Sequence, residues 1–473
     1  MMCINSYKFK TRIGIGPSCD DVMLAVEDSD LRTENLLPPP LVGTWVSERC
    51  EVRPGPEYLL RWHYYSENGT FRHNTYVYKD DGCSKPVWSR CVKGRYGVRG
   101  RSLHMPDASQ ADFTLQEVMV MVYSGTMAQD LSARANTSCP GVTVGQWMPK
   151  VEYVVYKPRE RNDSVEPSRE DIDKERSCMD LLKLSYEDVV LLRIQRRPPL
   201  VYDTWGVREE LLLGETKAKF TVFADPLIRA NQTTGCVPCQ LVHESTLLYP
   251  PILDLRPPLP IHLTGEWVSM RCEIKHHNLF LRRRVRVSGK SWHAEYSFFS
   301  DPQCTCKTIL ATAEGNYLPA GPAVVSKVLG AKDFDFSVER TFLTVYEEEL
   351  ASSLEQDGTC GPPGKWLIGT ARDLSNSGGC PALGITTPTT EYELVRIESD
   401  SSGNSILFLG QSEERKGVKK ERPTHFQPPL LHCASPEFPL TQLLNSFNAG
   451  GSFRPFATTV LSLFTLALVP RLY

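Results

Sequence analysis

The stretch Gly43-Thr44-Trp45-Val46-Ser47-Glu48-Arg49-Cys50-Glu51 occurs again 222 positions later as Gly265-Glu266-Trp267-Val268-Ser269-Met270-Arg271-Cys272-Glu273, with seven of nine residues identical. Landmarks downstream keep nearly the same offset, because Cys83 corresponds to Cys304 and Cys139 to Cys360, both 221 apart. A self-match of this length at a fixed offset is the signature of an internal repeat. The chain is therefore a tandem duplication of one module of about 200 residues.

The repeated stretch has the composition of a structural strand. Its Gly allows a tight backbone entry, and Trp and Val favour a strand whose large apolar side chain anchors in a core. The Cys then ties the strand to a distant segment. We expect this stretch to be the first strand of each module and to touch no ligand, because a motif without site geometry does not define a function.

Composition shifts divide the chain around the two copies. Proline-rich entries at residues 38–40 and 257–260 mark the starts of the modules. The expected parts follow chain order: a disordered leader (1–37), a first β module (38–230), a linker with a C-x-x-C motif (231–258), a second β module (259–435), a linker (436–455) and a hydrophobic membrane tether (456–473).

The two ends of the chain bear on its location. Residues 1–30 lack an apolar run of the length that a signal peptide needs. Residues 456–469 are apolar or weakly polar, which is short for a span of ~20 residues. Small residues before this run also resemble a lipid-anchor addition signal. A transmembrane helix and a lipid anchor both stay open, and a buried terminal helix is the alternative.

Composition restricts the cellular compartment and the class of binding partner that we expect for this chain. A net charge of -3 gives no basic surface for nucleic acid. Fifteen cysteines, eight of which match between the copies, indicate a disulfide framework of the secretory pathway. Four glycosylation sequons agree, at Asn68, Asn136, Asn162 and Asn231. Nucleophile elbows, phosphate loops and zinc-protease motifs are absent from the sequence, so we expect no enzyme, no metal and no cofactor.

Period-two alternation indicates a mainly β fold. It occurs at residues 58–65, 70–78, 87–96, 113–123 and 334–338, and Asn68-Gly69 predicts a hairpin turn between the first two. Short helices are expected near residues 125–135 and 347–356, at equivalent places in the copies. These features predict two tandem antiparallel β-barrel-like modules stabilised by disulfides, with a sandwich as the other closed arrangement.

The cysteines fall into matched and unmatched sets. Cys50, Cys83, Cys139 and Cys178 match Cys272, Cys304, Cys360 and Cys380, and the simplest pairing joins first with second and third with fourth. Cys91 and Cys306 are extras, one per module, and are candidates to join the modules to each other. Cys236 and Cys239 favour a structural disulfide over a redox or zinc site. Counting Cys433 as structural leaves an odd total, so one thiol is unpaired or one of Cys3 and Cys19 joins the set.

Candidate ligand contacts come from aromatic and methionine side chains on the predicted strands of the first module. Both alternating faces of residues 113–123 are apolar, so this strand is buried on both sides or lines a cavity. Such side chains suit an apolar chain, although plain core packing is the alternative. The candidates are Trp62, Tyr64, Tyr76, Phe113, Met119 and Met121.

Four motifs together carry a resemblance to a known family. The doubled G-x-W-V-S-x-R-C-E, Cys236-x-x-Cys239, Asn376-Ser-Gly-Gly-Cys380-Pro-Ala-Leu-Gly-Ile385 and Pro428-Pro-Leu-Leu-His-Cys433-Ala-Ser435 resemble the adenomatosis polyposis coli down-regulated protein family, most closely its "-like" branch. The resemblance covers residues 38–435.

The resemblance implies a membrane-tethered glycoprotein that inhibits Wnt signalling upstream of β-catenin. It implies binding to Wnt proteins and LRP-type co-receptors, and an apolar cavity for the acyl chain of Wnt, within two adjacent β-barrel-like domains. The Wnt-inhibitor hypothesis competes with two others from the residues alone. One is a barrel that carries free lipids, and the other is a structural cell-surface adhesion protein.

Overall fold

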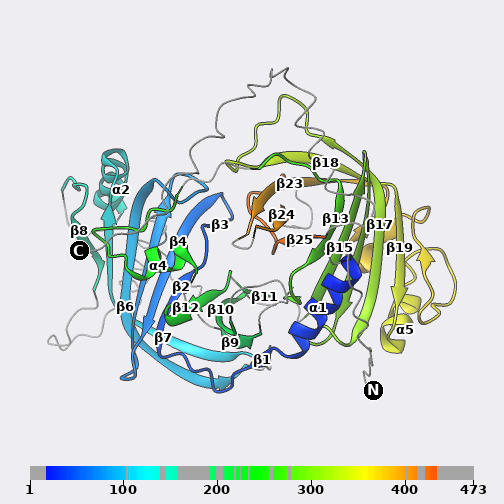
Figure 1. Cartoon of the computed structure of the whole chain (residues 1–473), viewed down its shortest axis with the longest axis horizontal. Coiled ribbons are helices and arrows are strands. Elements are labelled where there is room, and N and C mark those ends of the chain that lie inside the picture. Colours follow the sequence, from blue (N-terminus) through cyan, green and yellow to red (C-terminus); the bar gives the residue numbers. More distant parts are fainter. Residues whose placement is uncertain are drawn as a thin grey trace, which may run out of the picture.

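A computed structural model describes residues 18–102, 105, 107–138, 145–157, 180, 191–198, 206–217, 220–223, 225–232, 235–254, 259–274, 279–400, 403–412 and 421–433. Strands are the predominant secondary structure of the described residues. They form two large antiparallel sheets, one from each half of the chain, which lie side by side (Figure 1). The mainly β prediction is confirmed.

The first sheet closes into an eight-stranded barrel. The ring runs through β2 (Gly43–Ser47), β4 (Glu57–Tyr65), β5 (Thr70–Tyr78), β6 (Pro86–Arg101), β7 (Ser109–Val122), β9 (Leu191–Arg197), β10 (Arg208–Lys217) and β12 (Leu227–Arg229). Pairing of β7 with β9 and of β12 with β2 completes it. The expected Asn68-Gly69 hairpin joins β4 to β5. The ring is extended by β1 (Glu34–Asn35), β3 (Glu51–Arg53), β8 (Glu152–Tyr156) and β11 (Phe220–Phe223).

The second sheet repeats the same order. Its ring contains β13 (Gly265–Ser269), β15 (Phe280–Ser288), β16 (Ser291–Phe299), β17 (Lys307–Pro319), β18 (Lys332–Val338), β23 (Thr389–Ser399), β24 (Ser405–Leu409) and β25 (Leu430–Cys433). The long β7 of the first copy is divided here into β18 and β19 (Arg340–Val345), which both pair with β17. Short strands accompany the ring: β14 (Glu273–Ile274), β20 (Arg372–Asp373), β21 (Gly379–Cys380) and β22 (Ile385–Thr386).

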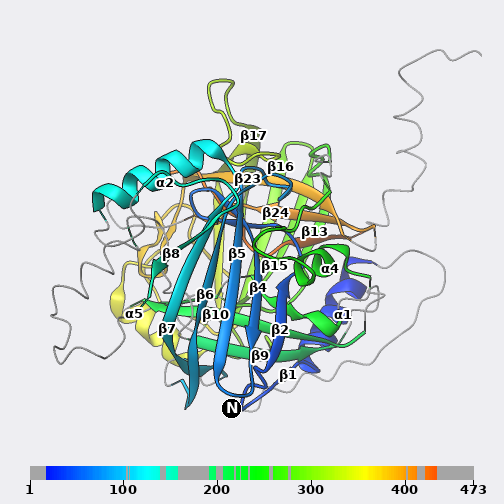
Figure 2. The same ribbon diagram turned by 90° about the vertical axis from the view of Figure 1, so that its left-hand side faces the viewer.

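Each barrel has an apolar core on its inner face. In the first, side chains from all eight ring strands meet around Trp45, Tyr65 and Leu211. In the second, Trp267, Phe336 and Leu407 belong to the corresponding cluster. Helices at the expected equivalent places, α2 (Gly125–Ser138) and α5 (Glu348–Asp357), pack beside β7 and β19 (Figure 2). Two 3-10 turns, η1 (Ala230–Gln232) and η3 (Pro381–Leu383), complete the elements.

Two helices that the sequence did not reveal cover the outer faces of the barrels. α1 (Cys19–Leu31) lies in the segment expected to be a disordered leader, and a capping box from Ser18 and Asp21 starts it. Its buried Val22 packs on the second barrel, which gives this segment a reason to be ordered. α4 (Val237–His243) lies in the expected linker, and its Val242 packs on the first barrel.

The disulfides largely follow the duplication. Cys50–Cys83 and Cys272–Cys304 confirm the first-with-second pairing, and Cys360–Cys380 confirms third with fourth in the second module. Cys139 and Cys178 lie outside the described residues. Cys236–Cys239 is a disulfide, as expected, but it opens helix α4 rather than lying in an irregular loop.

The unmatched cysteines differ from expectation. Cys91 is a buried free thiol, whereas Cys306 is disulfide-bonded, so these two do not join the modules to each other. The reason is that Cys91 lies on β6 with its side chain packed among the apolar residues of the first barrel's outer face. Cys19 and Cys433 are also free and buried.

Candidate functional site

A buried Ser–Glu–Arg cluster accounts for the repeated stretch in the first barrel. Ser47 Oγ donates to Glu51 Oε1 at 2.8 Å, and Arg61 Nε donates to the same oxygen at 2.8 Å. The Arg61 backbone N–H returns to Ser47 Oγ at 2.7 Å, and its Nη2 reaches the carbonyl of Asp225, two residues before β12, at 2.5 Å. The cluster therefore ties β2, β3 and β4 to the approach of the closing strand.

The second barrel holds the same cluster. Ser269 donates to Glu273 at 2.7 Å, and Arg283 Nε donates to Glu273 Oε1 at 2.8 Å. Arg283 Nη2 reaches the carbonyl of Pro428, two residues before β25, at 2.5 Å. Sequence reasoning missed Arg61 and Arg283, although their separation is the repeat offset of 222. The cluster gives the repeat the structural role expected for it.

The glycine and tryptophan of the repeat face a side chain of the strand that closes each barrel, β12 in the first and β25 in the second. Gly43 and Gly265 have φ of +118° and +126°, a left-handed region that favours glycine. A Cβ there would meet Arg229 in the first copy and His432 in the second. Those two side chains instead lie against the buried rings of Trp45 and Trp267, at 4.3 and 4.5 Å respectively.

The six predicted ligand residues lie on opposite faces of the first sheet. Tyr76, Met119 and Met121 are buried on the outer face, packed with the Cys236–Cys239 disulfide of α4. Trp62 on the same face is partly buried and stacks with Tyr64, whose exposed fraction is 41%. Phe113 alone points to the inner face. The structure does not bring the six together around one space.

Phe113 belongs to an aromatic cluster inside the first barrel. Its ring centroid lies 5.1 Å from that of Phe71 and 6.4 Å from those of Tyr65 and Tyr96. Tyr65 and Phe71 are buried, whereas Tyr96, Phe113 and the neighbouring Leu115 are partly exposed. The cluster thus runs from solvent into the core. Of its members, only Phe113 was selected from the sequence.

Neutral polar groups line the buried end of this cluster. The imidazoles of His63 and His73 stack with centroids 3.8 Å apart. Burial lowers the pKa of each well below its usual value, and the nearby Arg61 and Arg90 lower it further. Burial raises the pKa of Tyr65, so its phenol stays protonated. Among the described residues, no hydrogen-bond partner faces Tyr65 Oη or His63 Nδ1.

A small cleft lies between the barrels. Its lining comes from both copies: Arg49, Cys50, Val52, Asp225, Arg396, Phe408, Phe426 and Gln427. The space inside measures about 20 Å³, room for about one water molecule, which is far too little for a long acyl chain. None of the six predicted residues lines it.

The duplicated Arg of the repeat holds the barrels against each other. Arg271 donates twice to Glu210 of the first barrel, at 2.9 and 3.0 Å. In the other direction, Arg49 lies 4.9 Å from the ring centre of Phe408 in the second barrel. Arg271, Arg197 and Gln195 lower the pKa of the buried Glu210 to about 2, against the desolvation that opposes them. The repeated Arg of each copy therefore contacts the barrel of the other copy.

The remaining sequence-predicted features are mostly at the surface or outside the described residues. Asn68, Asn136 and Asn231 are exposed, and Asn162 is not among the described residues. The expected tether at residues 456–473 also lies outside them. Within the part of the chain that the structure describes, no helix has the length and apolar character needed to cross a membrane.

One comparison with known proteins bears on this arrangement. A family model described as "Adenomatosis polyposis coli down-regulated 1" matches residues 18–254 and again residues 256–438, so that each match contains one barrel. The match covers most of the chain and does not distinguish branches of the family. It is consistent with a protein related to the Wnt pathway.

Proposed function

The chain belongs to the adenomatosis polyposis coli down-regulated 1 family, and from this premise we propose that it is a membrane-tethered extracellular inhibitor of Wnt signalling. It binds Wnt by the acyl chain and acts upstream of β-catenin, with LRP-type co-receptors as further partners. The C-terminal segment 456–473 attaches it to the plasma membrane after secretion. Glycans occupy the exposed sequons.

The aromatic cluster of the first barrel is the observation that carries the acyl-binding proposal. Partly exposed Tyr96 and Phe113 lead to the fully buried Tyr65. An eight-stranded barrel has an interior that is either filled by its side chains or holds one small ligand, so the partly exposed rings must move apart to admit the chain. The acyl chain enters along these rings, and the neutral Tyr65 phenol donates to the carbonyl of its ester.

Burial of the acyl chain supplies free energy of the same order as the cost of association. Burying about a dozen methylenes contributes ~0.8 kcal/mol each, or ~10 kcal/mol in all. Association costs of roughly 4–15 kcal/mol offset much or all of this free energy. The ester hydrogen bond and protein–protein contacts add to what remains. The stacked His63 and His73 and the buried Tyr65 phenol lie in the first barrel, so the first barrel is the preferred site.

Binding of acylated and deacylated Wnt to the full chain, secreted behind a foreign signal peptide, tests the proposal. We expect loss of binding when the acyl group is removed. Phe113→Asp should reduce binding of acylated Wnt at least tenfold, because a charge then stands in the apolar path. Thr114→Asp is the matched control, since Thr114 is exposed on the other face of the same strand.

Other outcomes point to the competing functions. Equal binding with and without the acyl group would move the contact to a protein surface. Binding of free fatty acid with no preference for acylated protein would favour the lipid carrier. No apolar ligand together with binding to a second cell surface would favour the adhesion protein. Urea unfolding midpoints of both variants show whether Phe113→Asp has disturbed the fold itself.

A further inference from the structure

Two buried free thiols from distant parts of the chain lie together. Cys19 is the first residue of α1, and Cys433 is the last residue of β25. Both belong to one apolar cluster on the outer face of the second barrel, with Val268 and Leu431 from its strands. The Cys433 thiol is the largest influence on the pKa of Cys19, which it raises, so the two thiols of this cluster are neighbours. Over four hundred residues of chain separate them.

An independent set of contacts fixes the first turn of α1 at this position. Arg284 of β15 pairs with Asp20 at 3.0 Å and also pairs with Glu266 of β13. Glu266 is in turn the cross-strand partner of Cys433. Arg284 therefore holds Asp20, the residue after Cys19, close to Glu266, the cross-strand partner of Cys433.

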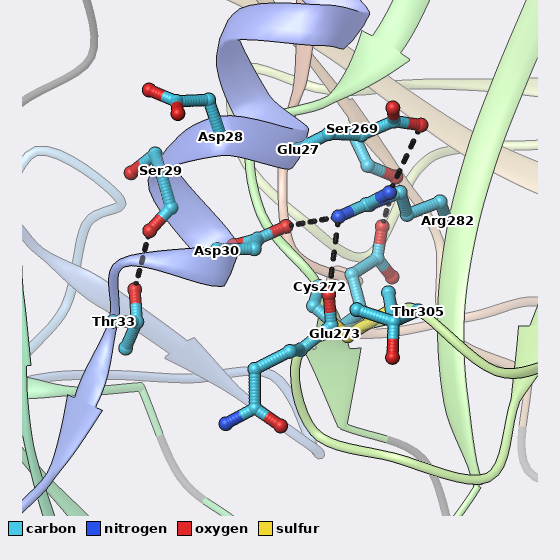
Figure 3. A network of polar contacts seen from close by, with 12 residues as sticks. Glu27, Asp28, Ser29, Asp30, Thr33, Ser269, Cys272, Glu273, Arg282 and Thr305 are labelled. Atoms are coloured by element: carbon cyan, nitrogen blue, oxygen red, sulfur yellow. Dashed lines mark hydrogen bonds and ion pairs between the residues drawn. A yellow bond between two sulfur atoms is a disulfide. The ribbon is translucent and has the colours of Figure 1, made fainter. Parts of the chain in front are cut away.

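The other end of α1 is held as firmly (Figure 3). Arg282 of β15 bonds to Asp30 at 2.8 Å and to Glu27 at 3.1 Å. The side chains of Arg282 and Asp30 are 9% and 6% exposed, so this pair is part of the packed interface. Contacts at both ends hold the helix in one position on the barrel. In that position the Cys19 and Cys433 thiols lie together.

The duplication shows what this position does. In the first barrel, Val46 and Ile228 on the outer face are covered by α4, whose start is closed by Cys236–Cys239. Their counterparts by strand register, Val268 and Leu431, are covered by α1. Each copy thus has a helix over the same patch of its closing strands. In the first copy a disulfide closes the start of that helix without joining it to a strand, whereas in the second copy the thiols lie on the helix and on a closing strand.

We propose that Cys19 and Cys433 form a disulfide in the secreted protein, which fastens α1 to the second barrel. The oxidant is a protein or glutathione disulfide of the secretory pathway. A thiolate from one cysteine attacks that disulfide, giving a mixed disulfide and one released thiol. The second cysteine then displaces the remaining oxidant thiol, so two protons and two electrons leave the pair.

The bond would also fix how the barrels sit together. After α1, the chain passes directly to β1, which pairs with β9 of the first barrel. Fastening α1 to β25 therefore links the first barrel covalently to the last strand of the second. The neighbouring Cys433 thiol and burial raise the pKa of Cys19, so the bond forms while the helix is still undocked and its thiolate is accessible.

Peptide mapping of the full secreted chain tests this. The protein is denatured without reductant, alkylated, digested and analysed by mass spectrometry. We expect one cross-linked peptide pair containing Cys19 and Cys433, which reduction separates. Cys91 is the internal control, because it is free and buried and should be alkylated in the same sample. Alkylation of Cys19 and Cys433 along with Cys91, or a different partner for either, would overturn the proposal.

Single variants test the consequence. Cys433→Ser should make Cys19 available to alkylation and raise amide hydrogen exchange across residues 19–31 at least tenfold. Cys91→Ser should leave both unchanged. If Cys433→Ser prevents secretion, reduction of the wild-type protein provides the same comparison, with exchange in α1 as its readout. Unchanged exchange after the 19–433 bond is broken would refute its fastening role.

Discussion

Buried imidazoles make the first barrel sensitive to acid at the level of single residues. His63 and His73 are almost completely buried and remain neutral because desolvation and nearby arginines lower the pKa of each. The unfolded chain binds protons at these residues near pH 6.5, whereas the folded chain does not. Their contribution to stability is thus complete above that pH and is lost as the pH falls below it.

The first prediction follows from this direction of the pH dependence of stability. Between pH 7.5 and 5.5 the free energy of unfolding of the first barrel should fall by up to about 1.4 kcal/mol per pH unit for each histidine below pH 6.5. His63→Leu combined with His73→Leu should flatten this dependence. Urea titrations at several pH values measure it. An equally steep dependence in the double variant would mean that other groups cause it.

A second prediction concerns the duplicated clusters. Glu51 and Glu273 have side chains only 1% exposed and each holds a buried arginine. Glu51→Ala or Glu273→Ala leaves that arginine unpaired, which costs about 3–5 kcal/mol. Glu314→Ala is the control, because its pair with Arg340 is exposed and worth less than about 1 kcal/mol. Similar losses in all three unfolding curves would contradict the role of the cluster.

At the level of elements, alternation located the strands but not what covers them. Residues 58–65 and 70–78 coincide closely with β4 and β5, because hydrophobic period is a local signal. The same signal cannot show which face is inside, so His63 and Tyr65 were missed while Trp62 and Met119 were chosen. Helices α1 and α4 were missed because they are short and gain their order from packing on a barrel, which for α1 is the second barrel, far along the chain.

The third prediction tests how α1 is held. Arg282→Met leaves the buried carboxylate of Asp30 unpaired, so we expect weaker docking by about 3–5 kcal/mol. Amide hydrogen exchange across residues 19–31 should rise accordingly. Arg286→Met on the same strand is the matched control, since Arg286 is 44% exposed and pairs with Glu266 and Glu295 rather than with α1. Equal protection in both variants would show that Arg282 is dispensable.

At the level of the whole molecule, the Arg of the repeat has a role that a single module could not reveal. Seven positions are identical between the copies, and the Trp, Ser and Glu act within each barrel. The repeated Arg instead reaches the other barrel, as Arg271 to Glu210 and Arg49 to Phe408. No sequence pattern distinguishes these roles, because the partner lies on a strand of the other copy.

The last prediction is that these contacts make the two barrels unfold together. A pKa of about 2 for Glu210, below its usual 4.5, corresponds to about 3 kcal/mol of stability at neutral pH, shared among Arg271, Arg197 and Gln195. This contribution is present above pH 4.5 and is lost as the pH falls towards 2. Arg271→Met removes the only one of these partners that comes from the second barrel, among the described contacts of Glu210.

We therefore expect Arg271→Met to lower the first thermal transition by several degrees and to separate a single calorimetric peak into two, because each barrel retains its own core and disulfides. Arg340→Met, at an exposed pair within the second barrel, should leave the single peak intact. A double variant with Glu210→Leu should recover part of the loss, since it removes a buried carboxylate that is left with only its first-barrel partners. Two peaks already in the wild-type protein would show that the barrels are not coupled.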